Sequence, residues 1–185
     1  KKSFNLEVKS YNSIGDEEVL AAKEVVESGI LSQFIGEWDA DFYGGPKVKE
    51  FENKWSKFFN IKHSVSVNSN TSGLMVALGA IGLEPGDEVI VSPWTMAASA
   101  TSILVWNAIP VFADIEPDTF NLDPISIENN ITKFTKAIVV TNIFGHAARL
   151  NEIMSIAQKY NLKVIEDNAQ APGAKYYKKF TGCVA

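Results

Sequence analysis

The chain has few of the residue types that build cross-links or nucleic-acid surfaces. Its 185 residues include a single cysteine, Cys183, and a single arginine, Arg149. A lone cysteine cannot form a disulfide within the chain, and it excludes a cysteine-built metal site. The net charge of −5 argues against nucleic acid or an anionic membrane as the main partner. Together these features predict a reducing, cytoplasmic location.

The pattern of the chain contains neither a signal peptide nor a membrane span. The first ten residues carry charges that no apolar run follows, so we expect no signal peptide. The uncharged stretch 89–113 is interrupted by Pro93 and Pro110 and by repeated Ser and Thr, whereas a spanning helix needs about 20 mostly apolar residues. We interpret this stretch as a strand, a helix and a strand buried inside a soluble domain.

Several well-known functional motifs are missing. There is no Walker loop, and no G-x-G-x-x-G follows the first apolar run, which disfavours a nicotinamide enzyme or a plain nucleotide-binding Rossmann domain. His63 and His146 have no second ligand at metal spacing, so no metal site is predicted. The chain is nevertheless 46% hydrophobic, which is enough apolar material for a sizeable folded core.

Two predicted helices make up an N-terminal arm over residues 1–60. The first begins near Asp16 and stops at Gly29. Pro46 opens the second, which is predicted to carry an inner apolar stripe: Val48, Phe51, Trp55, Phe58 and Phe59. No residue of this arm suggests catalysis.

From residue 61 onward, short apolar runs alternate with helical stretches. The runs are SVSV (64–67), EVIV (88–91), IPVF (109–112), KAIVV (136–140) and LKVIE (162–166). One helical face lies at Leu74 to Ile81 and another at Leu150 to Tyr160, and Asp123 caps a helix that Pro124 opens. This alternation predicts an α/β fold with a mostly parallel sheet that helices cover on both faces.

Ligands of open parallel sheets bind beyond the carboxyl ends of the strands, so the residues after each run are candidate site residues. Thr71 and Ser72 follow the first run and open a helix, whose free N–H groups and dipole favour an anion such as phosphate. The alternative is that Thr71 or Asn70 merely caps that helix. Trp94 follows the second run and is either a platform for a planar ring or ordinary core filling.

Two adjacent carboxylates, Glu166 and Asp167, end the last run. Successive strand residues point to opposite faces, so these two are poorly placed to share a proton. Asp167 is the better candidate for a ligand contact, because its carboxylate could hold a proton on a heterocyclic nitrogen through a charge-assisted hydrogen bond. The alternative is a cap or a loop-bracing residue.

Five segments in order resemble one enzyme family. They are VNSNTSGL (67–74), GDEVIVSPWTM (86–96), IPVFADIEPDTFNLD (109–123), TKAIVVTNIFG (135–145) and VIEDNAQAPGA (164–174). This set, with its D-x-A-Q-A-x-G signature, resembles the DegT-type nucleotide-sugar aminotransferases, which are pyridoxal 5'-phosphate (PLP) enzymes of fold type I, the aspartate aminotransferase fold. The resemblance implies that residues 61–185 are part of the large PLP-binding domain and that the C-terminal small domain is absent.

The resemblance assigns a role in cofactor binding to five positions. Thr71 and Ser72 would hold the phosphate of PLP, and Trp94 would stack on its pyridine ring. Asp167 would pair with the protonated ring nitrogen, and Gln170 would contact the ring near its 3-hydroxyl. A carboxylate at the ring nitrogen keeps the pyridinium protonated, so that the ring can accept electrons.

The same resemblance implies that this chain contains no catalytic residue of its own. The family's Schiff-base lysine is expected downstream of Ala185, while Lys175, Lys178 and Lys179 correspond to a variable hairpin before it. We therefore expect the chain alone to bind PLP weakly and to be inactive.

For the whole protein the resemblance implies transfer of an amino group from a donor such as glutamate to a nucleotide-linked keto-deoxysugar, in a homodimer that binds neither nucleic acid nor membrane. The alternatives are a PLP-dependent sugar 3-dehydratase of the same family, in which histidine replaces the lysine, and a catalytically inactive regulator or scaffold. The residue that separates the two enzyme activities lies beyond Ala185.

Overall fold

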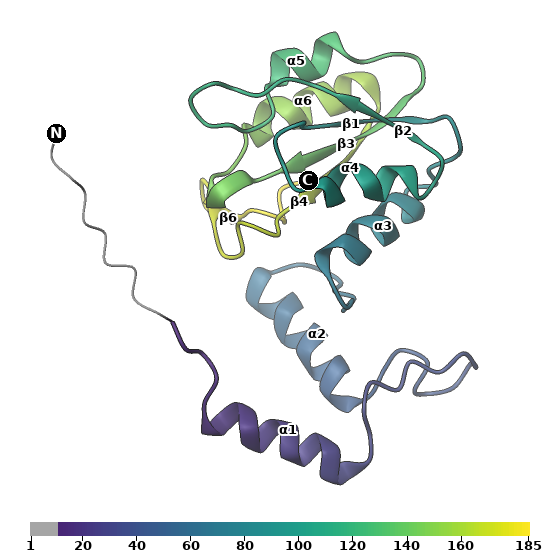
Figure 1. Cartoon of the computed structure of the whole chain (residues 1–185), viewed down its shortest axis with the longest axis vertical. Helices are drawn as coiled ribbons and strands as arrows, with labels where there is room; N and C mark the ends of the chain where they lie inside the picture. Colours follow the sequence, from purple (N-terminus) through teal and green to yellow (C-terminus); the bar gives the residue numbers. More distant parts are fainter. Residues whose placement is uncertain (1–10) are drawn as a thin grey trace, which may run out of the picture. The chain divides into compact units, whose positions relative to one another are not determined.

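A computed structural model describes residues 11–185, which divide into two compact units with a boundary between Ser66 and Val67 (Figure 1). The boundary falls six residues beyond the predicted end of the helical arm. None of the helices in residues 11–185 combines the length and the apolar composition that crossing a bilayer requires.

The first unit contains the two predicted helices, α1 (Asp16–Ser28) and α2 (Pro46–Phe59). Gly29 ends α1 in the left-handed conformation, with φ of 68°, which glycine adopts without steric cost. The predicted inner stripe of α2 is wrong, because neither helix contains a buried residue and Phe58 is 68% exposed. The aromatic rings of α2 instead contact one another. The ring centroids of Phe51 and Trp55, for example, are 5.6 Å apart. Two helices alone do not enclose a core.

The predicted strand over residues 64–67 does not form. Within the first unit, side chains of α2 satisfy the polar groups of this segment: Glu52 Oε1 accepts hydrogen bonds from Ser66 N (2.7 Å) and Ser66 Oγ (2.8 Å). Ser56 and Ser64 share a further hydrogen bond of 2.7 Å. An alternating apolar pattern produces a strand only when a neighbouring strand pairs with it, and this segment has no such partner in residues 11–185.

The second unit is built on a parallel sheet of four strands in the order β2-β1-β3-β4. The strands are β1 (Glu88–Val91), β2 (Ile109–Phe112), β3 (Thr135–Thr141) and β4 (Lys163–Asp167), each of which overlaps a predicted run. Every pairing between neighbours is parallel. Pro110 is tolerated because β2 lies at the edge of the sheet, where a missing N–H leaves no ladder bond unmade.

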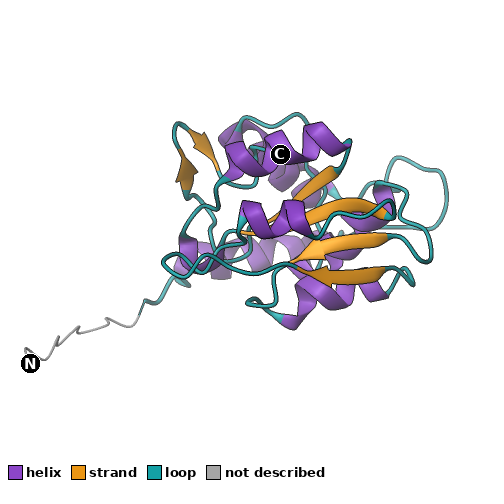
Figure 2. Ribbon diagram, turned by 90° about the horizontal axis from the view of Figure 1, so that it is seen from above, coloured by secondary structure: helices purple, strands orange, loops and turns teal. Residues whose placement is uncertain are grey.

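Helices cover both faces of this sheet, as predicted (Figure 2). On one face, α3 (Asn70–Ala80) and α4 (Ala97–Leu104) pack on the strands. On the other face lie α5 (Pro124–Asn129) and α6 (Leu150–Tyr160). Alternate strand residues supply the two cores: Val89, Val91 and Val139 meet Leu74, Leu78 and Ile103, whereas Ile90, Ile138 and Val140 meet Ile127, Leu150 and Ile153.

Two further local predictions are confirmed. Asp123 caps α5, since its Oδ1 accepts a hydrogen bond from Ile125 N at 3.1 Å. The segment of Lys175 to Phe180 forms a hairpin of β5 (Lys175–Tyr176) and β6 (Lys179–Phe180). Lys175 Nζ lies 4.8 Å from the centroid of the Phe180 ring, within the hairpin itself.

The strand order defines where a ligand can enter. From β1 the chain passes through α4 to β2 on one side, and from β3 it passes through α6 to β4 on the other. The winding therefore reverses between β1 and β3. The loops that leave the carboxyl ends of these two strands diverge at such a point, and the crevice between them is the usual ligand site of open α/β sheets.

Candidate functional site

The carboxylate of Asp167, at the carboxyl end of β4, is the central charge of the site. Its residue is only 4% exposed, so the carboxylate must be hydrogen-bonded within the protein. Oδ1 accepts hydrogen bonds from Asn70 Nδ2 (2.9 Å) and Ala169 N (3.3 Å), and Oδ2 accepts one from Ser99 Oγ (2.7 Å). All three donors are neutral, and no ion pair to Asp167 exists within residues 11–185. This buried negative charge is therefore suited to a cationic ligand atom.

The N-terminus of α3 lies directly beside this carboxylate, because Asn70 is its first residue. Ser69, and neither Thr71 nor Asn70, caps the helix: its Oγ accepts a hydrogen bond from Ser72 N at 3.2 Å. The capping alternative for Thr71 and Asn70 is thus wrong. Ser69 Oγ also donates to Ser72 Oγ at 3.1 Å, which leaves the Ser72 hydroxyl proton free to donate elsewhere. The first turn of a helix presents N–H groups without intrahelical partners, which together with these hydroxyls suits a phosphate.

A pocket of about 410 Å³ opens at the reversal point between β1 and β3. Trp94 belongs to its lining and is 51% exposed, so it is not core filling. The backbone that carries the indole is fixed, because Ser92 Oγ accepts a hydrogen bond from Trp94 N at 3.1 Å. Segments after three different strands line the pocket: Pro93, Trp94, Thr95 and Met96 after β1, Ile143 and Phe144 after β3, and Gln170 after β4.

Gln170 reaches this pocket in a defined orientation. Its Oε1 accepts a hydrogen bond from Phe144 N at 2.9 Å, so its Nε2 is the group left to donate to a ligand. Phe144 has a φ of 55°, an uncommon backbone conformation for a bulky residue. The strained turn after β3 thereby sets which end of the Gln170 amide faces the pocket.

Buried amides brace that turn. Asn142 is fully buried; its Oδ1 accepts from Ala148 N (3.0 Å), and its Nδ2 donates to Glu166 Oε2 (3.2 Å). Asn121, also buried, accepts from Ile143 N at 3.2 Å. These contacts tie the turn after β3 to the neighbouring loops on both sides.

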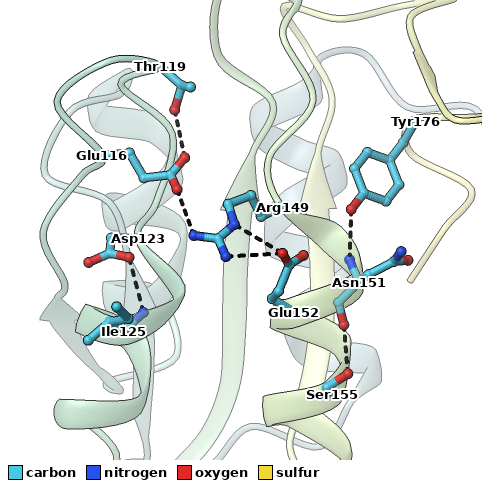
Figure 3. A network of polar contacts seen from close by, with 9 residues as sticks. All are labelled: Glu116, Thr119, Asp123, Ile125, Arg149, Asn151, Glu152, Ser155 and Tyr176. Carbon is cyan, nitrogen blue, oxygen red and sulfur yellow. Dashed lines mark hydrogen bonds and ion pairs between the residues drawn. The ribbon is translucent and has the colours of Figure 1, made fainter.

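The single arginine joins the loop after β2 to the start of α6 (Figure 3). Arg149, just before α6, forms ion pairs of 3.1 Å with Glu116 and with Glu152, and these contacts raise the pKa of its guanidinium. Glu116 also accepts from Thr119 at 2.8 Å. The loop after β2 is thus fastened beside α6, and its Phe120 ring lies 5.8 Å from Trp94 and 6.4 Å from Phe144.

Glu166 points to the opposite side of β4, as predicted from the alternation of strand residues. Its oxygens accept hydrogen bonds from the backbone N–H groups of Gly182 (2.8 Å), Val184 (2.7 Å) and Ala185 (2.9 Å). Its role is therefore to hold the segment that follows the hairpin, and it does not share a proton with Asp167.

The sequence did not reveal the roles of three of the residues that shape this site: Asn70, Ser99 and Phe144. The sequence pattern indicates only a helix cap at Asn70, whereas in the structure its amide joins α3 to Asp167. Ser99 lies in an apolar-looking helix, and nothing in its spacing shows that it faces a carboxylate 68 positions away. No group of three metal-binding side chains gathers anywhere in residues 11–185.

The fold defines a class of protein, the fold type I PLP-dependent enzymes. A family model, "DegT/DnrJ/EryC1/StrS aminotransferase family", matches residues 14–185, and the chain belongs to that family. Its members use PLP, and the resemblance drawn from the sequence is confirmed.

Three known proteins illustrate the relationship. "Spore coat polysaccharide biosynthesis protein SpsC" of Bacillus subtilis is 40% identical over 92% of this chain and 41% of its own. GDP-perosamine synthase of Caulobacter vibrioides is 42% identical over 75% of this chain and 37% of its own. The solved structure of NtdA from Bacillus subtilis, with bound cofactor PMP (pyridoxamine 5'-phosphate), superposes with a TM-score of 0.76 at 31% identity, covering 90% of this chain and 38% of that one. The chain thus spans about two fifths of the length of these relatives.

The residues of this chain fit the cofactor of the family. The ring nitrogen of PLP is a cationic donor when protonated, and Asp167 is a buried carboxylate that no cation of residues 11–185 neutralises. The phosphate is an anion, and the start of α3 with Thr71 and Ser72 is a cluster of donors. The pyridine ring of PLP can stack on an aromatic side chain, and the half-exposed indole of Trp94 is suited to this contact.

Proposed function

We propose that the protein containing this chain transfers an amino group from an amino-acid donor such as glutamate to a keto group on a nucleotide-linked deoxysugar, with PLP as cofactor. The observation that carries this proposal is the Asn70–Asp167 hydrogen bond of 2.9 Å, because it joins an anion-binding helix start to a buried carboxylate. PLP is a molecule that needs these two features next to each other. The name of the relative GDP-perosamine synthase supports a nucleotide-linked substrate.

The five predicted residues divide four tasks among them in this proposal. Thr71 and Ser72 hold the phosphate, Trp94 covers one face of the ring, and Gln170 donates its Nε2 to the ring oxygen. Asp167 accepts a hydrogen bond from the protonated ring nitrogen and so keeps the proton on that nitrogen. When bound, PLP supplies a pyridinium that withdraws electrons from the Cα–H bond of the donor amino acid.

The other parts of the proposal concern the whole protein. A lysine that follows Ala185 is expected to move the proton at Cα, and the hairpin residues Lys175, Lys178 and Lys179 are not expected to replace it. We also propose a cytoplasmic homodimer. Light scattering of the purified protein tests the dimer, and a monomer at micromolar concentration contradicts it.

Binding of PMP tests the cofactor role of this chain directly, because PMP carries an amine and needs no lysine. We expect one PMP per chain, detected by quenching of tryptophan fluorescence and by calorimetry. Asp167→Asn keeps the shape of the side chain but removes its charge. A charge-assisted hydrogen bond contributes about 1.5–3 kcal/mol, so we expect the variant to weaken PMP binding roughly 10- to 150-fold. Unchanged binding would instead favour an inactive scaffold.

The phosphate contact has its own control. Thr71→Val keeps the shape of the side chain and removes its hydroxyl, so it should weaken PMP binding several-fold while pyridoxamine, which lacks the phosphate, binds as before. Equal losses for both ligands would place the phosphate elsewhere.

Amino transfer itself requires the whole protein. We expect purified holoenzyme to convert glutamate into 2-oxoglutarate in a single turnover, and to aminate a nucleotide-linked keto-deoxysugar under multiple turnover. A deoxygenated sugar product in place of an aminated one would identify the protein as the 3-dehydratase.

A further inference from the structure

Asp167 is held by two side chains that no motif of the sequence assigned, Asn70 and Ser99. They come from the starts of different helices on the same face of the sheet, and each binds a different oxygen of the carboxylate. A carboxylate that rotates freely about its Cβ–Cγ bond cannot keep one lone pair aimed at a ligand. Two donors on opposite oxygens stop that rotation.

The donors also determine which oxygen remains open. An ionised carboxylate has about four lone-pair sites, two on each oxygen. Asn70 Nδ2 and Ala169 N occupy both sites of Oδ1, at 2.9 and 3.3 Å, whereas among residues 11–185 Oδ2 accepts only Ser99 Oγ, at 2.7 Å. The remaining site of this buried carboxylate is therefore on Oδ2.

Two further hydroxyl groups, those of Thr95 and Thr141, form a hydrogen-bonded chain that ends at Ser99. Ser99 Oγ lies 3.1 Å from Thr95 Oγ1, which lies 3.3 Å from Thr141 Oγ1. Ser99 has one hydroxyl proton, and the carboxylate can only accept, so that proton is committed to Asp167. Thr95 must then donate to Ser99, and Thr141 to Thr95. All three hydroxyls point toward the carboxylate, and hydrogen bonds aligned in this way strengthen one another.

We propose that Asn70 and Ser99 are positioning residues that fix the Asp167 carboxylate so that Oδ2 meets the protonated ring nitrogen of the cofactor. The inference rests on the proposed function and deepens it. Asn70 has a second effect, since it joins the carboxylate to the first turn of α3 and so sets the spacing between the two ends of the cofactor site. Neither residue is expected to touch the cofactor ring.

Ser99→Ala and Asn70→Ala test this positioning role, with Ser102→Ala as the matched control. Ser102 is on the same helix as Ser99, is equally buried and donates to Ser99 O at 3.1 Å, without contact to Asp167. We expect Ser99→Ala and Asn70→Ala each to weaken PMP binding about fivefold or more, and Ser102→Ala to leave it within about twofold. Thermal melting of every variant reports any general loss of stability.

A second ligand separates positioning from structural damage. In an analogue of PMP, CH replaces the ring nitrogen, so Asp167 has no proton to accept. Ser99→Ala should bind this analogue as tightly as the wild-type chain does, because its effect runs through the nitrogen contact alone. Asn70→Ala, which also alters the spacing to the first turn of α3, should lose less affinity for the analogue than for PMP. Equal losses for PMP and its analogue overturn the positioning role.

The possible outcomes keep the two proposals apart. In one outcome the wild-type protein binds PMP and Asp167→Asn weakens that binding, but Ser99→Ala and Asn70→Ala do not. This outcome supports the proposed function and overturns the positioning role. A wild-type protein that binds no PMP overturns both. If Ser99→Ala and Asn70→Ala each lose more affinity for PMP than for its analogue, the result supports both the proposed function and the positioning role.

Discussion

Gly79 offers a sharp test of how α3 is held in place. It lies in the last turns of α3, and a Cβ added there would stand 2.2 Å from Cζ2 and 2.5 Å from Cη2 of Trp106. The indole is held across this position, because its Nε1 donates to Met75 O at 2.9 Å. Gly79→Ala therefore forces the ring to move.

Opposing effects decide the sign of this substitution. Alanine favours a helix over glycine by about 1 kcal/mol. Displacing the ring loses a hydrogen bond worth about 1 kcal/mol and adds overpacking of about 1–3 kcal/mol. We expect Gly79→Ala to lower the free energy of unfolding by about 1–3 kcal/mol. In a Trp106→Ala background the obstacle is gone, and the same substitution should raise it by up to about 1 kcal/mol.

Urea unfolding followed by far-UV circular dichroism measures both changes, since this signal does not depend on the tryptophan. Gly73→Ala is the matched control in the same helix, because its Cβ would meet only Val67 Cγ2 at an ordinary 3.6 Å. It should be neutral or stabilising. A Gly79→Ala chain that is as stable as Gly73→Ala, or a loss that persists without Trp106, refutes the reasoning.

Three other substitutions or treatments follow from the structure. Ile153→Ala, at a fully buried position of α6, should lower the free energy of unfolding by about 2–5 kcal/mol and Ile153→Val by only about 0.5–1.5 kcal/mol in the same urea assay; equal losses would contradict the packing of this core. Asp123→Ala removes the cap of α5 and should cost about 1 kcal/mol, whereas Asp123→Asn, which can still cap, should cost less. Burial, with a smaller contribution from the charge of Glu166, raises the pKa of the Cys183 thiol, so iodoacetamide at pH 8 should modify it several-fold more slowly than free cysteine. Mass spectrometry measures that rate, and modification as fast as that of free cysteine would contradict a shielded thiol.

Local pattern predicted most of the elements of the second unit. The four runs that became β1 to β4 are short and apolar on both faces, and this composition is specific to strands covered by helices on both sides. The cap at Asp123 was equally clear, because one capping residue stands directly before one proline. The run over residues 64–67 alternates serine with valine, which is also a strand signal, but pairing depends on a neighbour that local signal does not contain.

The details of the site were harder to predict for a related reason. Four consecutive capping-type residues, Ser69 to Ser72, compete for one cap position, and only the folded backbone selects Ser69. Asn70 and Ser99 act through contacts with a residue 97 and 68 positions away, which no local spacing records. The resemblance to the family located Asp167 and Gln170, but not the groups that orient them.

The contact between Asn70 and Asp167 closes a span of 97 positions. A ligand that contacts both the first turn of α3 and Asp167 binds only the folded second unit, so its binding free energy adds wholly to folding. At a free concentration one hundred times its dissociation constant, such a ligand contributes about 2.7 kcal/mol. With PLP in the proposed site, a higher cofactor concentration should therefore raise the free energy of unfolding of this chain.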